Sequence, residues 1–292
     1  MKAICVHEYG GPEVLLYEEV PDPVPGPGEL LVEVRAAGVN FADINSRIGR
    51  YKPALPWIPG NEAAGVVIGL GDGVKDFKIG DRVAWGTAPA GLPIRYTYPG
   101  QGGKVRDTVA KTYAEKAVVT ADRAVKIPEA ISFEQAAAVM LQGITAHYLA
   151  FAAYPVKPGD RVLIHAGAGG VGLLLTQLAK ECGATVYTTV SSEEKAALSR
   201  EAGADHVIIY TKEDFAEVVD RLTGGTGVEA VYDSVGATTF EGSLQSLKPR
   251  GYLVFFGMSG GPVPPFDLIR LNTGSYYVTR PSYAHYTETR EE

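Results

Sequence analysis

The stretch HAGAGGVGLLLTQLAK, residues 165–180, decides the fold, because it joins a glycine-rich turn directly to a helical pattern. It continues the apolar run RVLIHA at 161–166, and its glycines match the spacing G-x-G-x-x-G at Gly167, Gly169 and Gly172. The helix behind them has an apolar stripe, formed by Val171, Leu174, Leu175 and Leu178. A strand, a glycine turn and a helix in this order predict the loop that holds a dinucleotide pyrophosphate. The alternative is a turn that binds nothing.

Strands and helices alternate from residue 160 onward. The expected strands are short β-branched or aromatic runs: RVLIHA, ATVYTTV, HVIIY, EAVYDSV, GYLVFFG and GSYYVTRP. Helical patterns fill the earlier gaps; EDFAEVVDRL, for example, places Phe215, Val218, Val219 and Leu222 on one face. This alternation predicts a parallel sheet wrapped by helices.

The first part of the chain has a different pattern. ELLVEVRAAGV, residues 29–39, alternates apolar and polar residues as a half-buried strand does, and FKIGDRVAWG and YAEKAVV indicate further strands. SFEQAAAVMLQGITAHYLAFAA, residues 132–153, begins with Ser132 and Gln135 at the spacing of a capping box, which predicts a helix. We therefore expect a β-rich lobe at 1–125 and a second lobe at 126–280.

Composition limits the kinds of partner. The chain has 292 residues, 46% hydrophobic and 21% charged, which is typical of a globular protein. A net charge of −7 without clusters of basic residues argues against nucleic acid. Cys5 and Cys182 are too few and too far apart for a disulfide framework or a zinc finger. No signal peptide and no apolar run of about 18 residues are evident, so we expect a cytoplasmic protein without a membrane partner.

The end of the second strand of this lobe indicates the type of dinucleotide. NAD sites usually place an acid there, whereas this chain has Ser191 and Ser192, with Lys195 in the next helix. Hydroxyls and a cation suit a 2′-phosphate, which favours NADPH. Glu193 and Glu194 argue for NADH instead, if either carboxylate reaches a ribose hydroxyl. The structural alternative is that both acids only stabilise the first turn of the helix.

Several motifs, in order over nearly the whole chain, resemble one family. They are GVNFAD at 38–43, PGNEAAGVV at 59–67, GDRVAW at 80–85, GITAHYL at 143–149, HAGAGGVG at 165–172, VYDSVG at 231–236, FFGMSG at 255–260 and GSYYVTRPS at 274–282. The family is that of the zinc-independent quinone oxidoreductases, the zeta-crystallin type of the medium-chain dehydrogenase/reductases. The resemblance implies an α/β fold with a GroES-like β-rich lobe and a Rossmann lobe with a doubly wound parallel sheet. It also implies bound NADPH and a homodimer formed through the Rossmann lobe.

Zinc-dependent members of this superfamily hold a catalytic metal through a Cys, a His and a second Cys. The matching positions here carry Asn40, Asn61 and Gln142, and carboxamides are poor zinc ligands. We therefore expect no metal, and hydride transfer to an acceptor that is already electrophilic, such as a quinone. A 2-alkenal or enoyl reductase acting on a conjugated carbonyl is the alternative enzyme. A catalytically silent NADPH-binding protein is the alternative of another class.

The resemblance also implies the site residues. Asn40 and Thr145 are catalytic candidates by their family positions, and Tyr51, in GRYKP, is our own candidate for an acid or anchor on the substrate side, with a structural tyrosine as the alternative. The cofactor-binding candidates are Asn40, Thr145, Tyr148, Gly167, Gly169, Gly170, Val171, Gly172, Ser191, Ser192, Lys195, Tyr210, Ser234, Phe256 and Gly257. His147 and His165 are expected to be structural, because apolar neighbours surround both. The chain departs from the family pattern at 88–111, an apparent insertion that is either a lid or a surface hairpin. The resemblance also implies that residues 281–292 are the start of a return to the first lobe, whose C-terminal completion is apparently missing.

Overall fold

The computed structural model describes residues 1–87 and 111–291, so the predicted insertion lies almost wholly outside the described residues. Contacts between Cα atoms divide the chain into two compact units. The first unit comprises Met1–Leu141 with Thr287–Glu292, and the second comprises Gln142–Tyr286. The start of the helix expected at 132–153 therefore belongs with the first unit and its end with the second.

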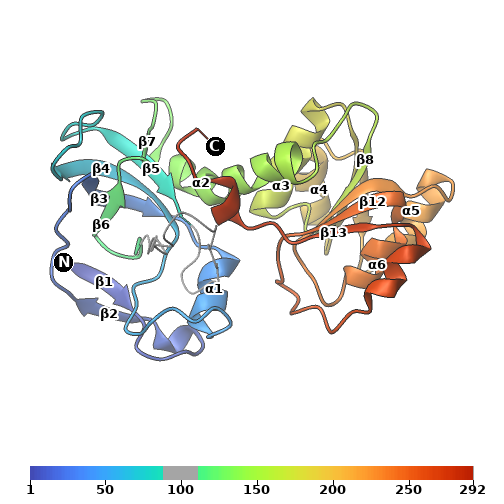
Figure 1. Cartoon of the computed structure of the whole chain (residues 1–292), viewed down its shortest axis with the longest axis horizontal. Coiled ribbons are helices and arrows are strands. Elements are labelled where there is room, and N and C mark those ends of the chain that lie inside the picture. Colours follow the sequence, from blue (N-terminus) through green and yellow to red (C-terminus); the bar gives the residue numbers. More distant parts are fainter. Residues whose placement is uncertain (88–110, 292) are drawn as a thin grey trace, which may run out of the picture. The chain divides into compact units, whose positions relative to one another are not determined.

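The first unit is built on a five-stranded antiparallel sheet in the order β6-β3-β4-β5-β7 (Figure 1). Its strands are β3 (Glu29–Ala37), β4 (Glu62–Leu70), β5 (Arg82–Gly86), β6 (Lys116–Thr120) and β7 (Val125–Lys126). The alternation read in 29–39 is confirmed, because Leu30 and Val32 are fully buried in a core with Val67, Val83 and Trp85.

Shorter elements complete the first unit. Strands β1 (Lys2–Cys5) and β2 (Leu16–Glu19) form a hairpin around the 3₁₀ turn η1 (Pro12–Val14), and helix α1 (Phe41–Arg47) follows β3. The chain end also belongs to this unit. Arg290 donates to the backbone oxygens of Asp122 and Ala124 at 3.0 and 2.6 Å, and Arg123 donates to Thr287 at 3.1 Å.

The second unit is a six-stranded parallel sheet in the order β10-β9-β8-β11-β12-β13. Its strands are β8 (Arg161–Ile164), β9 (Thr185–Val190), β10 (His206–Ile209), β11 (Val228–Asp233), β12 (Leu247–Phe255) and β13 (Tyr277–Thr279). The six expected strands and the doubly wound α/β fold are thus confirmed. The chain runs outward from β8 in one direction and then from β11 in the other, so the strand order reverses between β8 and β11. Sheets of this kind bind ligands outside the carboxyl ends of the strands at such a reversal.

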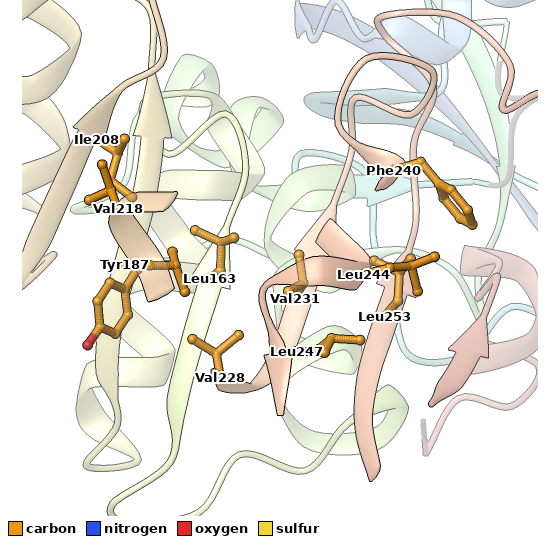
Figure 2. Packing of buried hydrophobic residues seen from close by; sticks show 11 residues of the cluster. Leu163, Tyr187, Ile208, Val218, Val228, Val231, Phe240, Leu244, Leu247 and Leu253 are labelled. Carbon is orange, nitrogen blue, oxygen red and sulfur yellow. The ribbon is translucent and has the colours of Figure 1, made fainter. Parts of the chain in front are cut away.

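Helices α3 (Gly170–Glu181), α4 (Glu193–Glu201), α5 (Phe215–Thr223) and α6 (Phe240–Gln245) cover this sheet (Figure 1). The 3₁₀ turns η3 (Leu268–Thr273) and η4 (Tyr283–Tyr286) follow β12 and β13. Figure 2 shows the core under α5 and α6, where Val218 and Leu244 pack with strand residues Leu163, Val231 and Leu253. Consecutive residues of β8 are fully buried, so both faces of the sheet are covered, as expected of a parallel sheet.

Helix α2 (Phe133–Tyr148) and the π-helical turn η2 (Leu149–Ala153) correct one expectation. Together they form one helix of 21 residues with a hydropathy of 1.4, long and apolar enough to cross a membrane by length and composition. The core helix of a water-soluble protein meets the same criterion. Ala136 and Ala137 are buried against Ala64 and Ala84 of the first sheet, as in such a core helix. The predicted capping box is present, because Ser132 N–H donates to Gln135 Oε1 at 3.0 Å and Gln135 N–H donates to Ser132 Oγ at 3.2 Å.

Candidate functional site

The glycine loop joins β8 to α3, and the structural need for glycine differs among its positions. At Gly172 a Cβ would lie 2.3 Å from the backbone oxygen of Ala166, and at Gly167 it would lie 2.5 Å from Thr188 Cβ. These two glycines let α3 and β9 approach the turn. At Gly169 the nearest atom would be the Ala166 oxygen at 3.2 Å, so packing within the protein requires a glycine there less strictly than at the other two positions. The tight turn itself depends on Ala166, whose φ is +53°.

Helix α3 begins without a side-chain cap, as α6 does and unlike α4 and α5. Its N-cap is Gly169, which offers no side-chain acceptor, whereas Ser192 caps α4 and Asp214 caps α5 with side-chain oxygens. The first amides of a helix need acceptors, and the helix dipole favours a negative one. The start of α3, open at Gly169, is therefore suited to a phosphate.

The carboxyl ends of the parallel strands bring together the sequence-predicted residues of the second unit. Gly167 to Gly172 follow β8, Ser191 and Ser192 follow β9, Tyr210 follows β10, Ser234 follows β11, and Phe256 and Gly257 follow β12. Phe256 N–H donates to Asp233 O at 2.8 Å, and a Cβ at Gly257 would lie 2.5 Å from Ser234 O. Neighbouring parallel strands end at the same edge of the sheet, so these segments form one continuous border.

At one end of this border lie the residues predicted to bind a 2′-phosphate. Ser192 Oγ accepts from Lys195 N–H at 3.3 Å, and the Tyr210 side chain is 53% exposed. Among residues 1–87 and 111–291 the Lys195 side chain makes no ion pair or hydrogen bond. The border therefore offers an exposed cation beside the capped start of α4.

His165, which follows β8, is held in a buried polar network that sequence spacing did not show. Its Nδ1 lies 2.9 Å from Thr189 Oγ1, and its Nε2 lies 3.0 Å from Ser243 Oγ. Ser243 Oγ donates to Asp233 Oδ2 at 2.9 Å, so it accepts from His165 Nε2–H. Burial lowers the pKa of His165, which keeps the ring neutral. Because the serine lies between the histidine and the acid and is fully buried, this group ties strands together and is no nucleophile.

Three further candidates of the second unit lie on or near helix α2. Tyr148 is buried, and its ring stacks on Tyr286 with centroids 4.6 Å apart. Burial raises the pKa of Tyr148, while its hydrogen bond with Thr145 acts in the opposite direction. Gln142 lies beside the start of α3, since a Cβ at Gly170 would meet its amide oxygen at 1.7 Å.

In the first unit, Asn40 and Asn61 belong to a buried network with two acids. Asn40 Nδ2–H donates to Glu62 Oε1 at 2.7 Å, and Asn61 Nδ2–H donates to Asp43 Oδ1. Asp43 Oδ2 also accepts from the Asn40 backbone N–H at 2.8 Å and from Tyr113 at 3.0 Å. The other Glu62 oxygen accepts from Leu141 N–H at 2.6 Å. Each carboxamide is thus oriented by an N–H group that donates to a carboxylate oxygen.

Desolvation dominates the electrostatics of this network. Burial raises the pKa of Asp43 to about 6, although the hydrogen bonds from Asn40, Tyr113, Gly60 and Asn61 oppose the shift. Burial also raises the pKa of Glu62, and the nearby Asp43 charge adds to that effect. Neither acid forms an ion pair within residues 1–87 and 111–291, so burial favours the protonated form of each more than in an exposed carboxyl group.

Sequence reasoning named Asn40 and Asn61 but assigned no role to Asp43, Glu62 or Tyr113. One local signal existed for Asp43, because Asn40 and Asp43 have the spacing of a capping box at the start of α1, and the structure has one. Tyr51, the substrate-side candidate, is half-buried just after α1, and its backbone N–H donates to Asn45 O at 3.0 Å. No described side chain bonds its hydroxyl.

Comparisons with known proteins agree with both units. The chain matches the alcohol dehydrogenase GroES-like domain over residues 26–129 and the zinc-binding dehydrogenase family over residues 170–288. It is 44% identical to the quinone oxidoreductase of Pseudomonas aeruginosa, over 100% of this chain and 84% of that protein. It is 39% identical to a 2-haloacrylate reductase of a Burkholderia species, over 99% of this chain and 84% of that protein. The crystal structure of Escherichia coli quinone oxidoreductase complexed with NADPH superimposes with a TM-score of 0.90 at 43% identity, covering 100% of this chain and 84% of that one.

Proposed function

The chain belongs to the quinone oxidoreductase family of the medium-chain dehydrogenase/reductases, and we propose that it catalyses hydride transfer from NADPH to a quinone. One observation carries the proposal. The uncapped start of α3 and the exposed Lys195 lie on the same border of the parallel sheet, where they suit a pyrophosphate and a 2′-phosphate respectively. NADH has no 2′-phosphate and therefore no group that needs Lys195.

The residues of the second unit fit this cofactor. Gly169, Gly170, Val171 and Gly172 present backbone at a helix start that lacks a side-chain acceptor. Ser191, Ser192, Lys195 and Tyr210 hold the adenosine phosphate end, while Ser234, Phe256 and Gly257 flank the cofactor from β11 and β12. When bound, NADPH supplies the hydride, and the protein positions it and excludes water.

We assign the catalytic work to Asn40 and Tyr51 of the first unit and Thr145 of the second. Asn40 has an amide fixed by Glu62, which makes it a preoriented donor for a carbonyl oxygen that gains charge. Tyr51 serves the substrate side, and Thr145 with Tyr148 serves the nicotinamide side. No metal enters this scheme.

The direct test is consumption of NADPH, followed by absorbance, with several small quinones. Turnover with at least one quinone is expected, and tight NADPH binding without turnover by any acceptor would point to a silent binding protein. Lys195→Ala tests the phosphate assignment. The lost charge-assisted contact of about 1.5 to 3 kcal/mol should weaken NADPH roughly tenfold or more and leave NADH nearly unchanged. Lys157→Ala, an exposed lysine before β8, is the matched control.

A second candidate activity is reduction of a C=C bond conjugated to a carbonyl. Its support is the similarity to the 2-haloacrylate reductase, a relative nearly as similar as the quinone oxidoreductases. The two activities differ in product, so chromatography after incubation with a quinone or with an unsaturated carbonyl compound separates them. A saturated product from the second substrate, at a rate above that with quinones, would favour this alternative.

We further propose a cytoplasmic homodimer that forms through the second unit without membrane or nucleic acid. Strand β13 supports this, because it ends the sheet order and its Tyr277 and Val278 side chains are 51% and 41% exposed. An open strand edge with apolar side chains is a pairing surface for a second copy. Light scattering on the purified protein should give twice the chain mass of 31.0 kDa, and Val278→Pro should reduce it.

A further inference from the structure

Lys212 lies beside the 2′-phosphate end of the border but was not among the sequence-predicted residues. Its Nζ forms an ion pair with Glu193 Oε1 at 2.8 Å, and Glu193 is the first residue of α4, next to the cap Ser192. We propose that Lys212 is a specificity-determining residue that selects NADPH over NADH by holding Glu193 away from the phosphate site. This inference rests on the proposed cofactor site.

The geometry follows from two parallel strands ending side by side. Ile209 of β10 pairs with Val190 of β9, and Tyr210 N–H continues the ladder to Val190 O at 3.1 Å. One residue further, Thr211 Oγ1 donates to Ser191 O at 3.1 Å. Lys212 N–H in turn donates to Ile209 O at 2.8 Å, which fixes the turn after β10. Lys212 is therefore held opposite the start of α4.

The charges explain why this pair matters. Glu193, Glu194 and Lys195 alone give the start of α4 a net charge of −1, which Lys212 brings to zero. The hydrogen bond and the charge of Lys212 lower the pKa of Glu193, so its carboxylate is ionised at neutral pH. An unpaired Glu193 would repel a 2′-phosphate and would be available to accept from the 2′-hydroxyl of NADH. With Lys212 occupied by the acid, Lys195 remains for the phosphate.

The test measures dissociation constants of NADPH and NADH by nicotinamide fluorescence for wild type, Lys212→Ala, and Lys212→Ala combined with Glu193→Gln. Both side chains are exposed, so an effect of about three- to fivefold is expected, in keeping with exposed charge interactions. Lys212→Ala should weaken NADPH by that factor, leave NADH equal or tighter, and lose its effect in high salt. Adding Glu193→Gln should restore NADPH binding, whereas adding Glu194→Gln should restore much less.

Arg221→Ala is the matched control, because it also removes one cation from an exposed ion pair in the second unit, with Glu213. A Lys212→Ala variant whose NADPH to NADH ratio equals that of Arg221→Ala refutes the inference. Failure of Glu193→Gln to restore NADPH binding also refutes it, because Lys212 would then act on the phosphate directly. Wild-type protein that binds no NADPH refutes the proposed function itself, which is a separate outcome.

Discussion

Two alanine substitutions in the glycine loop should separate packing from cofactor binding. Gly172→Ala places a Cβ 2.3 Å from the Ala166 oxygen and 3.0 Å from Gly167 Cα, both backbone atoms that cannot rotate away. Such overpacking costs about 1 to 3 kcal/mol. For a unit of this size that lowers Tm by roughly 3 to 10 °C without any ligand. Gly169→Ala meets only the Ala166 oxygen at 3.2 Å, so its Tm loss should be smaller, mainly a modest loss at the N-cap.

Gly169→Ala should weaken NADPH binding more, relative to the Tm it loses, than Gly172→Ala does. A methyl group at Gly169 stands where the backbone has to approach a pyrophosphate, and losing one charge-assisted contact of about 1.5 to 3 kcal/mol weakens NADPH roughly 10- to 100-fold. Thermal unfolding without ligand and NADPH titration on the same preparations are the two assays. The reasoning is refuted if Gly169→Ala lowers Tm as much as Gly172→Ala, or if it binds NADPH like wild type.

Three other perturbations address the first unit. Because the pKa of Asp43 is raised, its contribution to stability is present below pH 4 and is lost as pH rises through about 6. The free energy of unfolding of Asp43→Asn should therefore rise relative to that of wild type by on the order of 2 to 3 kcal/mol across that range. Denaturant unfolding of both proteins at several pH values checks this, and a difference that stays constant with pH would contradict it. Glu62→Gln leaves one of its two donors, Asn40 or Leu141, facing an amide N–H, and should lower stability by about 1 to 3 kcal/mol in thermal unfolding, whereas the exposed Glu33→Gln should not. Dialysis against a strong chelator should leave quinone turnover unchanged, and a loss restored by zinc would overturn the metal-free scheme.

Sequence reasoning succeeded where a feature depends on neighbours along the chain. Each of the six parallel strands, the glycine loop and the capping box of Ser132 and Gln135 is encoded in its own short segment, through periodicity, glycine spacing and side-chain reach. The alternation in residues 29–39 likewise sufficed to assign β3 and its buried face.

It failed where residues far apart in sequence meet. Asn40 and Glu62 are brought together by the antiparallel pairing of β3 with β4, and His165, which follows β8, contacts Ser243 of α6 across a sequence separation of 78 residues. The ion pair of Lys212 with Glu193 depends in the same way on β10 ending next to β9. A pattern read along one segment contains no information about such pairings. The left-handed φ of +53° at Ala166 was also unforeseen, because glycine motifs suggest that the glycines take that role.

The acids of the first unit connect the loss of metal ligands with the change of reaction. Asn40 and Asn61 direct N–H groups at Glu62 and Asp43, so each amide satisfies a carboxylate without neutralising its charge. No cation among the described residues pairs with either acid, and burial then raises both pKa values. A divalent ion at the same positions would lower them instead. Reduction of a quinone consumes a proton along with the hydride, whereas oxidation of an alcohol releases one. Buried acids whose pKa values are raised suit the reaction that consumes a proton, and the uncharged amide donors at Asn40 and Asn61 leave those pKa values raised.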